Sequence, residues 1–141
     1  GETSRGSRSC PGLRTWSWPE VFQSSTSIEL LICYKTSGNI RPIIPVLLDI
    51  GINMHWPVEC AAGMDVLELR REFGRDLRLV GGIARQAVMD GIEAVEKEFY
   101  RKVPPLMGDG GYIPAIDDII MSDMSYAAFR RFDELVREYE L

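Results

Sequence analysis

The chain alternates short apolar runs with longer amphipathic segments, and this alternation constrains its fold more than any other feature. The apolar runs predict β-strands at residues 28–34, 52–56, 77–80 and 110–118. A segment with apolar residues at helical spacing follows each run, and these segments predict helices beginning near residues 39, 65, 83 and 125. The repeated strand-helix order predicts an α/β fold with four parallel strands.

The length of the chain and the composition of its first residues indicate the domain organisation. With 141 residues, the chain is shorter than the roughly 250 residues of a complete (β/α)8 barrel. Residues 1–27 are rich in Ser, Arg and Gly without a regular period, so they are expected to be a mobile or loosely packed arm. Residues 28–141 then form one domain, whose strand-following loops meet at one end of the sheet.

Charge and cysteine content exclude several classes of protein. The net charge of −5 gives no basic stripe for nucleic acid, and no apolar run has the roughly 18 residues of a membrane span. The three cysteines have unrelated spacings, which indicates neither a disulfide framework nor a zinc ribbon. A cytoplasmic protein that binds neither nucleic acid nor membranes is therefore expected.

The last predicted strand ends in two adjacent carboxylates, Asp117 and Asp118. Pro114 lacks an N–H and so must face a sheet edge or a strand end. The pair can hold a substrate N–H, act as acid or base, or only cap the loop. Adjacent side chains point in different directions, so we expect at most one carboxylate to face a ligand.

Two further features have both a functional and a structural interpretation. Gly81-Gly82 follows a predicted strand and is interpreted as leading directly into a helix. Glycines at such a junction can let a phosphate or carboxylate approach the backbone N–H groups, although a tight turn explains them more simply. His55, Glu59 and Cys60 lie close together in the sequence, but their spacing matches no common zinc pattern. A structural role for His55 is the favoured interpretation, and no metal site is predicted.

The chain resembles the C-terminal half of the uroporphyrinogen decarboxylase superfamily, which also contains corrinoid-linked methyltransferases. The matching runs include Gly81-Gly82 and residues 38–40, 57–59, 61–65, 69–74, 110–118 and 123–124. The resemblance implies the last four units of a (β/α)8 barrel, with a site at the carboxyl ends of its strands. The predicted substrate-binding residues there are Asn39, Glu59, Gly81, Gly82, Asp117 and Asp118. Of the two acids, Asp118 aligns with the family's polar position, so the resemblance implies that Asp118 faces the ligand and that Asp117 turns toward the loop backbone.

Three departures from the family pattern shape the functional expectation. Residues 1–27 lack the arginine-rich motif that handles substrate carboxylates in the decarboxylases. Lys35 and Ser37 stand where the methyltransferases carry zinc ligands, and Asp118 stands where many decarboxylases have a histidine. We therefore expect a truncated member that handles a tetrapyrrole or a small methylated substrate without a cofactor, and with impaired autonomous activity.

The alternative is a non-catalytic half-barrel that pairs with itself or with a complementary barrel half. Four parallel strands leave two open edges and one uncovered face. That face is expected to carry Leu31, Ile32, Leu79 and Ile113 and to promote association.

Overall fold

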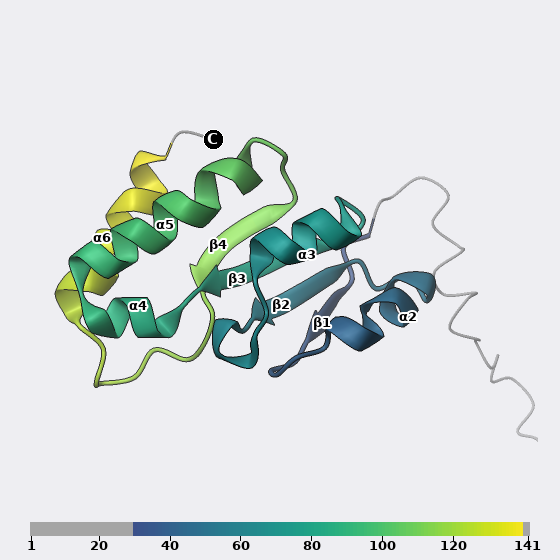
Figure 1. Ribbon diagram of the computed structural model, residues 1–141, viewed down its shortest axis with the longest axis horizontal. Helices are drawn as coiled ribbons and strands as arrows, with labels where there is room; N and C mark the ends of the chain where they lie inside the picture. Colours follow the sequence, from purple (N-terminus) through teal and green to yellow (C-terminus); the bar gives the residue numbers. More distant parts are fainter. Residues whose placement is uncertain (1–29, 140–141) are drawn as a thin grey trace, which may run out of the picture.

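A four-stranded parallel sheet forms the centre of the computed structural model, which describes residues 30–139 (Figure 1). The strands lie in the order of the chain, β1-β2-β3-β4. Their bounds are β1 (Cys33–Lys35), β2 (Met54–Val58), β3 (Arg78–Ile83) and β4 (Tyr112–Ile116). The predicted α/β class with parallel strands is confirmed, while the predicted arm at residues 1–27 lies outside the described residues.

The connecting segments are helical and lie along one side of the sheet, where α3 runs beside α5 and α6 packs on α5 (Figure 1). They are η1 (Arg41–Ile43), α2 (Ile44–Asp49), η2 (Cys60–Ala62), α3 (Val66–Phe73), α4 (Arg85–Asp90), α5 (Ile92–Met107) and α6 (Tyr126–Glu138). Because right-handed crossovers join strands in sequential order, every helix falls on the same side.

The core lies between this side of the sheet and the helices. Leu79 and Ile83 of β3 meet Val95 and Phe99 of α5, and all four side chains are buried. We call the opposite side, which carries Lys35, Trp56, Val80 and Ile113, the open face. Ile113 is 55% exposed on the open face, whereas Leu79 is 1% exposed. The expectation that Leu79 faces outward is wrong, because it alternates with Val80 along β3.

Two helix starts are as predicted, because their signals are local. Asp65 Oδ1 accepts hydrogen bonds from the N–H groups of Leu67 (2.8 Å) and Glu68 (3.2 Å) before α3. Ser125 Oγ accepts from the N–H of Ala128 (3.3 Å) before α6. The helix expected to begin near residue 39 starts one residue later than Asn39 would cap it: the N-cap of η1 is Ile40, and Asn39 Oδ1 accepts from the N–H of Arg41 (3.1 Å).

The first predicted strand is shorter in the structure than in the sequence analysis. β1 begins at Cys33 rather than at residue 28, and residues 28–29 lie outside the described part of the chain. Its residues alternate between exposed and half-buried. The apolar run favours a strand covered on both faces. Residues 33–35 are covered on one face only, since the described helices lie on one side of the sheet.

The third unit differs most from the prediction. Gly81 and Gly82 continue β3 instead of turning into a helix, with φ values of 105° and 78°. A Cβ on Gly82 would lie 2.2 Å from Cγ1 of Val66, so glycine lets α3 pack directly on the strand. The predicted single helix from residue 83 is two helices, since Gly91 at φ 112° separates α4 from α5.

Two prolines, whose sequence pattern favours the end of a helix, lie inside α5 instead. Pro104 and Pro105 are in the last turn of α5, which continues to Met107. Neither proline has an N–H to bond the carbonyl four residues earlier, but the N–H groups of Gly108 and Gly110 bond the carbonyl oxygens of Pro104 (3.4 Å) and Leu106 (3.0 Å), so helical bonding resumes after them. The helix therefore extends past the prolines and buries Leu106 in the core.

Candidate functional site

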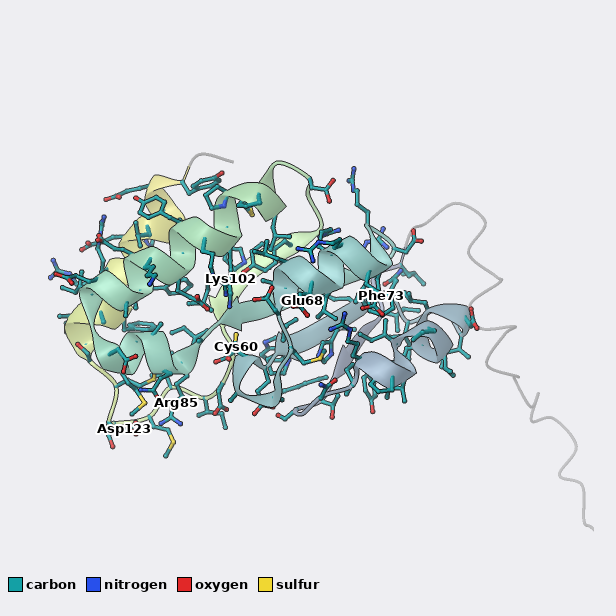
Figure 2. All side chains as sticks on the ribbon, viewed as in Figure 1. Cys60, Glu68, Phe73, Arg85, Lys102 and Asp123 are labelled. Atoms are coloured by element: carbon teal, nitrogen blue, oxygen red, sulfur yellow. The ribbon has the colours of Figure 1, made fainter. Side chains whose placement is uncertain are left out.

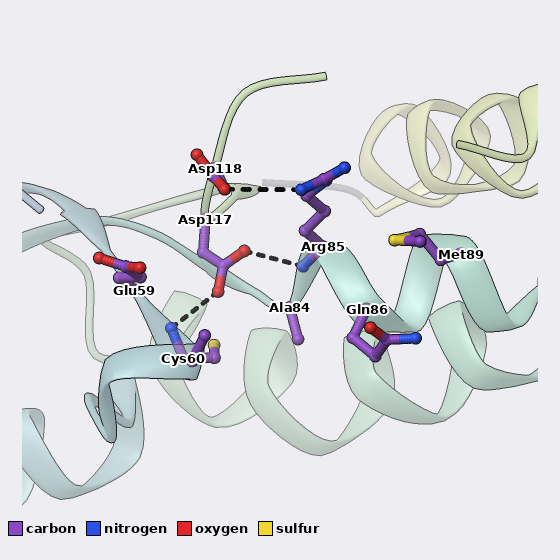
Figure 3. Close-up of a pocket in the computed structure, with 9 residues that line it drawn as sticks. Glu59, Cys60, Ala84, Arg85, Gln86, Met89, Asp117 and Asp118 are labelled. Carbon is purple, nitrogen blue, oxygen red and sulfur yellow. Dashed lines mark hydrogen bonds and ion pairs between the residues drawn. The ribbon is translucent and has the colours of Figure 1, made fainter. Parts of the chain in front are cut away.

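A pocket of about 340 Å³ lies at the carboxyl ends of β2, β3 and β4, where the three following loops meet (Figure 3). Its lining combines acidic, basic and sulfur-containing side chains with backbone. The lining residues are Glu59, Cys60, Ala61, Ala84, Arg85, Gln86, Met89, Asp117 and Asp118. Parallel strands place their following loops at one edge, so this position follows from the topology.

Asp117 joins the three loops to one another. Its Oδ2 accepts from the backbone N–H of Cys60 (2.7 Å), and its Oδ1 accepts from the backbone N–H of Arg85 (2.7 Å) (Figure 3). The side chain is buried, with both oxygens engaged. Asp117 therefore faces loop backbone and fixes the distance between the loops after β2 and β3.

Asp118 faces the opposite direction and remains half exposed, with 49% of its side chain accessible. Its Oδ2 lies 3.8 Å from Nη1 of Arg85, while Nη2 of Arg85 bonds both carboxylate oxygens of Asp123 at 2.9 Å. The Arg85 guanidinium is thus held mainly by Asp123. Asp118 keeps capacity to accept hydrogen bonds from a ligand.

A second pocket, of about 270 Å³, lies on the open face at the same end of the sheet. It is lined by residues of β1, β2 and β4 and of the loops that follow β1 and β4. These are Lys35, Ser37, Trp56, Pro57, Ile116, Asp118 and Ile119. Lys35 Nζ lies 4.4 Å above the centroid of the Trp56 ring. Asp118 lines both pockets and separates them.

A buried lysine of α5, Lys102, contacts Cys60, which lines the first pocket (Figure 2). Lys102 is 1% exposed, and its Nζ donates to the Gly82 carbonyl oxygen (2.6 Å) and to Sγ of Cys60 (3.3 Å). It also forms an ion pair with Glu98, one turn earlier on α5. These contacts satisfy the three ammonium donors, which is the condition for burying a charge.

The Cys60 thiol is protonated at neutral pH. Burial raises its pKa to about 12, although the adjacent Lys102 ammonium acts in the opposite direction. The Sγ also lies 3.3 Å from the carbonyl oxygen of Gly82, to which the thiol can donate. Because a thiolate is the reactive form, Cys60 is placed here as a hydrogen-bonding group and not as an activated nucleophile.

The predicted site residues divide into two groups. Glu59, Asp117 and Asp118 come together around the first pocket, and a Glu59 oxygen accepts from the backbone N–H of Gly38 (2.6 Å). Gly81 and Gly82 lie buried below it, where their carbonyl oxygens accept from Tyr112 Oη (2.9 Å) and Lys102 Nζ. Their predicted position at a helix N-terminus is wrong, and Asn39 lines neither of the two pockets at this end.

Metal ligands do not assemble in the described part of the chain. Among residues 30–139, no group of three or more His, Cys, Asp or Glu side chains is arranged to hold a metal ion. His55 is buried on the helix-covered face, where its Nδ1 lies 3.2 Å from the carbonyl oxygen of Tyr34. Its Nε2 has no hydrogen-bond partner in this core environment.

Sequence reasoning missed Arg85, Lys102 and the pair of Lys35 with Trp56 as parts of the site. A signal for Lys102 existed: it lies three residues after Phe99 and four before Leu106, on the apolar face of the predicted helix. A lysine at a core position indicates a buried partner. The contact between Lys35 and Trp56 joins β1 to β2. It could not be predicted, because no local sequence pattern specifies which residues of the two strands lie opposite each other.

Comparisons with protein-family models, with curated proteins and with solved structures find no match to the chain. In residues 30–139, none of the helices has the length and apolar character needed to cross a membrane. The site must therefore be interpreted from its own geometry.

Proposed function

We propose that the chain is a C-terminal half-barrel of the uroporphyrinogen decarboxylase type, which holds a tetrapyrrole or a small methylated compound at the carboxyl ends of its strands. The observation that carries this proposal is the position of Asp118, an exposed carboxylate shared by two pockets at that end. The sequential order of four parallel strands, with helices on one side, supports a barrel-like arrangement.

The second pocket offers the contacts that a flat, acidic tetrapyrrole requires. Trp56 provides an aromatic ring for stacking, and Lys35 provides a cation for a carboxylate side chain. Asp118 accepts hydrogen bonds from pyrrole N–H groups. One cation is few for a ligand with several carboxylates, and the net charge of −5 repels it, so binding is weak and weakens further with salt.

The first pocket offers no activated group for catalysis by the single chain. Arg85, the cation of the first pocket, is already paired with Asp123, and the thiol of Cys60 is protonated. These two observations also favour the alternative function, a non-catalytic half-barrel whose loops serve only as connections. The two functions differ in whether Asp118 contributes to ligand binding.

Titration of a polycarboxylated porphyrin into the wild-type protein and Asp118→Asn, followed by absorbance at low and moderate salt, distinguishes them. We expect Asp118→Asn to weaken binding about tenfold, because a charge-assisted hydrogen bond is lost. Asp123→Asn is the matched control: it also removes a carboxylate from Arg85, but Asp123 lines neither pocket. Its affinity should stay within about twofold of wild type.

Equal affinities for wild type and Asp118→Asn would contradict the tetrapyrrole proposal and favour the non-catalytic half-barrel. A loss of affinity in Asp123→Asn equal to that in Asp118→Asn would assign the effect to Arg85 instead. Asp117→Asn is unsuitable as the main test, because it also breaks the bond that joins the loops.

A further inference from the structure

Within residues 30–139, the sheet ends in two unpaired edges, β1 on one side and β4 on the other. On β4, the carbonyl of Gly111 and the N–H of Asp117 bond to β3. Since bonding direction alternates along a strand, the N–H groups of Tyr112 and Ile116 face outward, as does the position of Pro114. Proline at the outward position leaves these two donors available for another strand.

An apolar groove runs beside the free edge of β4. It has a volume of about 210 Å³ and lies between β4, α5 and α6. Its lining includes Phe99, Met107, Ile113, Val136 and Tyr139. An incoming parallel strand with apolar side chains on its helix-facing side would fill this groove, and β1 has such a side chain in Tyr34, which packs against the core.

From these features we infer that two copies of this chain close one eight-stranded barrel, with β4 of each copy paired in parallel with β1 of the other. The inference rests on the half-barrel of the proposed function. A two-fold axis along the strands makes the two seams identical, so both free edges of both copies are paired. Eight strands is also the number at which side chains fill the interior of a barrel.

Charge at the seams favours this pairing. Lys35 lies at the carboxyl end of β1, and Asp118 lies just beyond the carboxyl end of β4. Parallel pairing places these two ends side by side, so Lys35 of the second copy comes beside Asp118. The second copy thereby supplies a cation to the mouth of the binding site and covers the exposed Trp56 and Ile113.

The first test is the mass of the full chain by light scattering and sedimentation across micromolar concentrations. We expect a discrete dimer, which Ile113→Glu dissociates by at least about 100-fold because two unpaired carboxylates enter the closed interior. Ile92→Glu is the matched control, since Ile92 is 45% exposed at the first residue of α5, outside the barrel. Its dimer should be as strong as that of wild type.

The second test separates a seam between copies from contacts within one copy. Asp118→Lys and Lys35→Glu each place like charges at both seams, and each should weaken its own dimer about tenfold. In a mixture of the two variants, every seam of the mixed dimer again joins opposite charges. We expect the mixture to form dimers at protein concentrations close to those at which the wild-type protein dimerises.

The inference would be overturned if the protein stayed monomeric at all concentrations or if its mass grew without limit. It would also be overturned if the mixed variants dimerised no more strongly than each variant alone. A dimer unaffected by Ile113→Glu would also overturn it, because the interface would then lie elsewhere. The proposed ligand is tested separately by the porphyrin titration: a dimer that does not bind porphyrin contradicts only the ligand, and a porphyrin-binding monomer contradicts only the closed barrel.

Discussion

The two faces of the sheet differ in how far their side chains are buried. Along β2 and β3, His55 and Leu79 face the helices and are buried, while their neighbours Trp56 and Val80 lie on the open face. Trp56 is 39% exposed there. The difference shows that the helix-covered face supplies the stability of the single chain, whereas the open face gains its burial only from a ligand or another chain.

The strongest test of the helix-covered face is Lys102→Ala. We expect it to lower the free energy of unfolding by about 4 kcal/mol, because Glu98 is left without its buried partner and the Gly82 carbonyl loses its donor. Chemical denaturation measures the loss. Lys97→Ala, an exposed position on the same helix, is the control and should change stability by less than about 0.5 kcal/mol.

A pair of neighbouring substitutions compares the two faces directly. Leu79→Ala should cost about 3 kcal/mol, because it leaves a cavity in the closed core. Val80→Ala, one residue later on the open face, should cost less than about 1 kcal/mol in a dilute sample. Denaturation curves of both variants at low protein concentration decide this, and equal losses would show that the open face is packed as tightly as the core.

The smallest expected effect is a dependence on pH from His55, the one histidine of the sequence. Burial lowers its pKa from 6.5, and the bond to Tyr34 offsets this only in part. The unfolded chain therefore binds more protons, and stability falls as pH drops below about 6.5. His55→Gln should remove this slope between pH 7 and pH 5, whereas identical slopes in both proteins would refute the assignment.

Features set by neighbouring residues were predictable from the sequence. Asp65 and Ser125 cap helices through bonds to residues two or three positions away, so a short pattern was sufficient. The four parallel strands followed from the alternation of apolar runs and helices. The position of Asp117 and Asp118 at a strand end followed from the same alternation.

Features set by distant partners were not predictable. Gly81-Gly82 has the composition of a turn, and only the approach of Val66 on α3 explains its place in a strand. The position of Lys102 on the apolar face of a helix indicates burial, but nothing local identifies its partners, because Cys60 and Gly82 lie 42 and 20 positions away. Such contacts depend on the packing of α5 against the sheet, which a single sequence does not encode locally.

The bonds made by Asp117 have a consequence for how this site can change. They hold the backbone N–H groups of positions 60 and 85 and do not involve the side chains there. A residue other than proline at position 85 therefore leaves both bonds in place, so the guanidinium at the first pocket can be exchanged without rebuilding the frame that presents it. Position 60 is less free, because the Cys60 thiol also accepts a hydrogen bond from the buried Lys102.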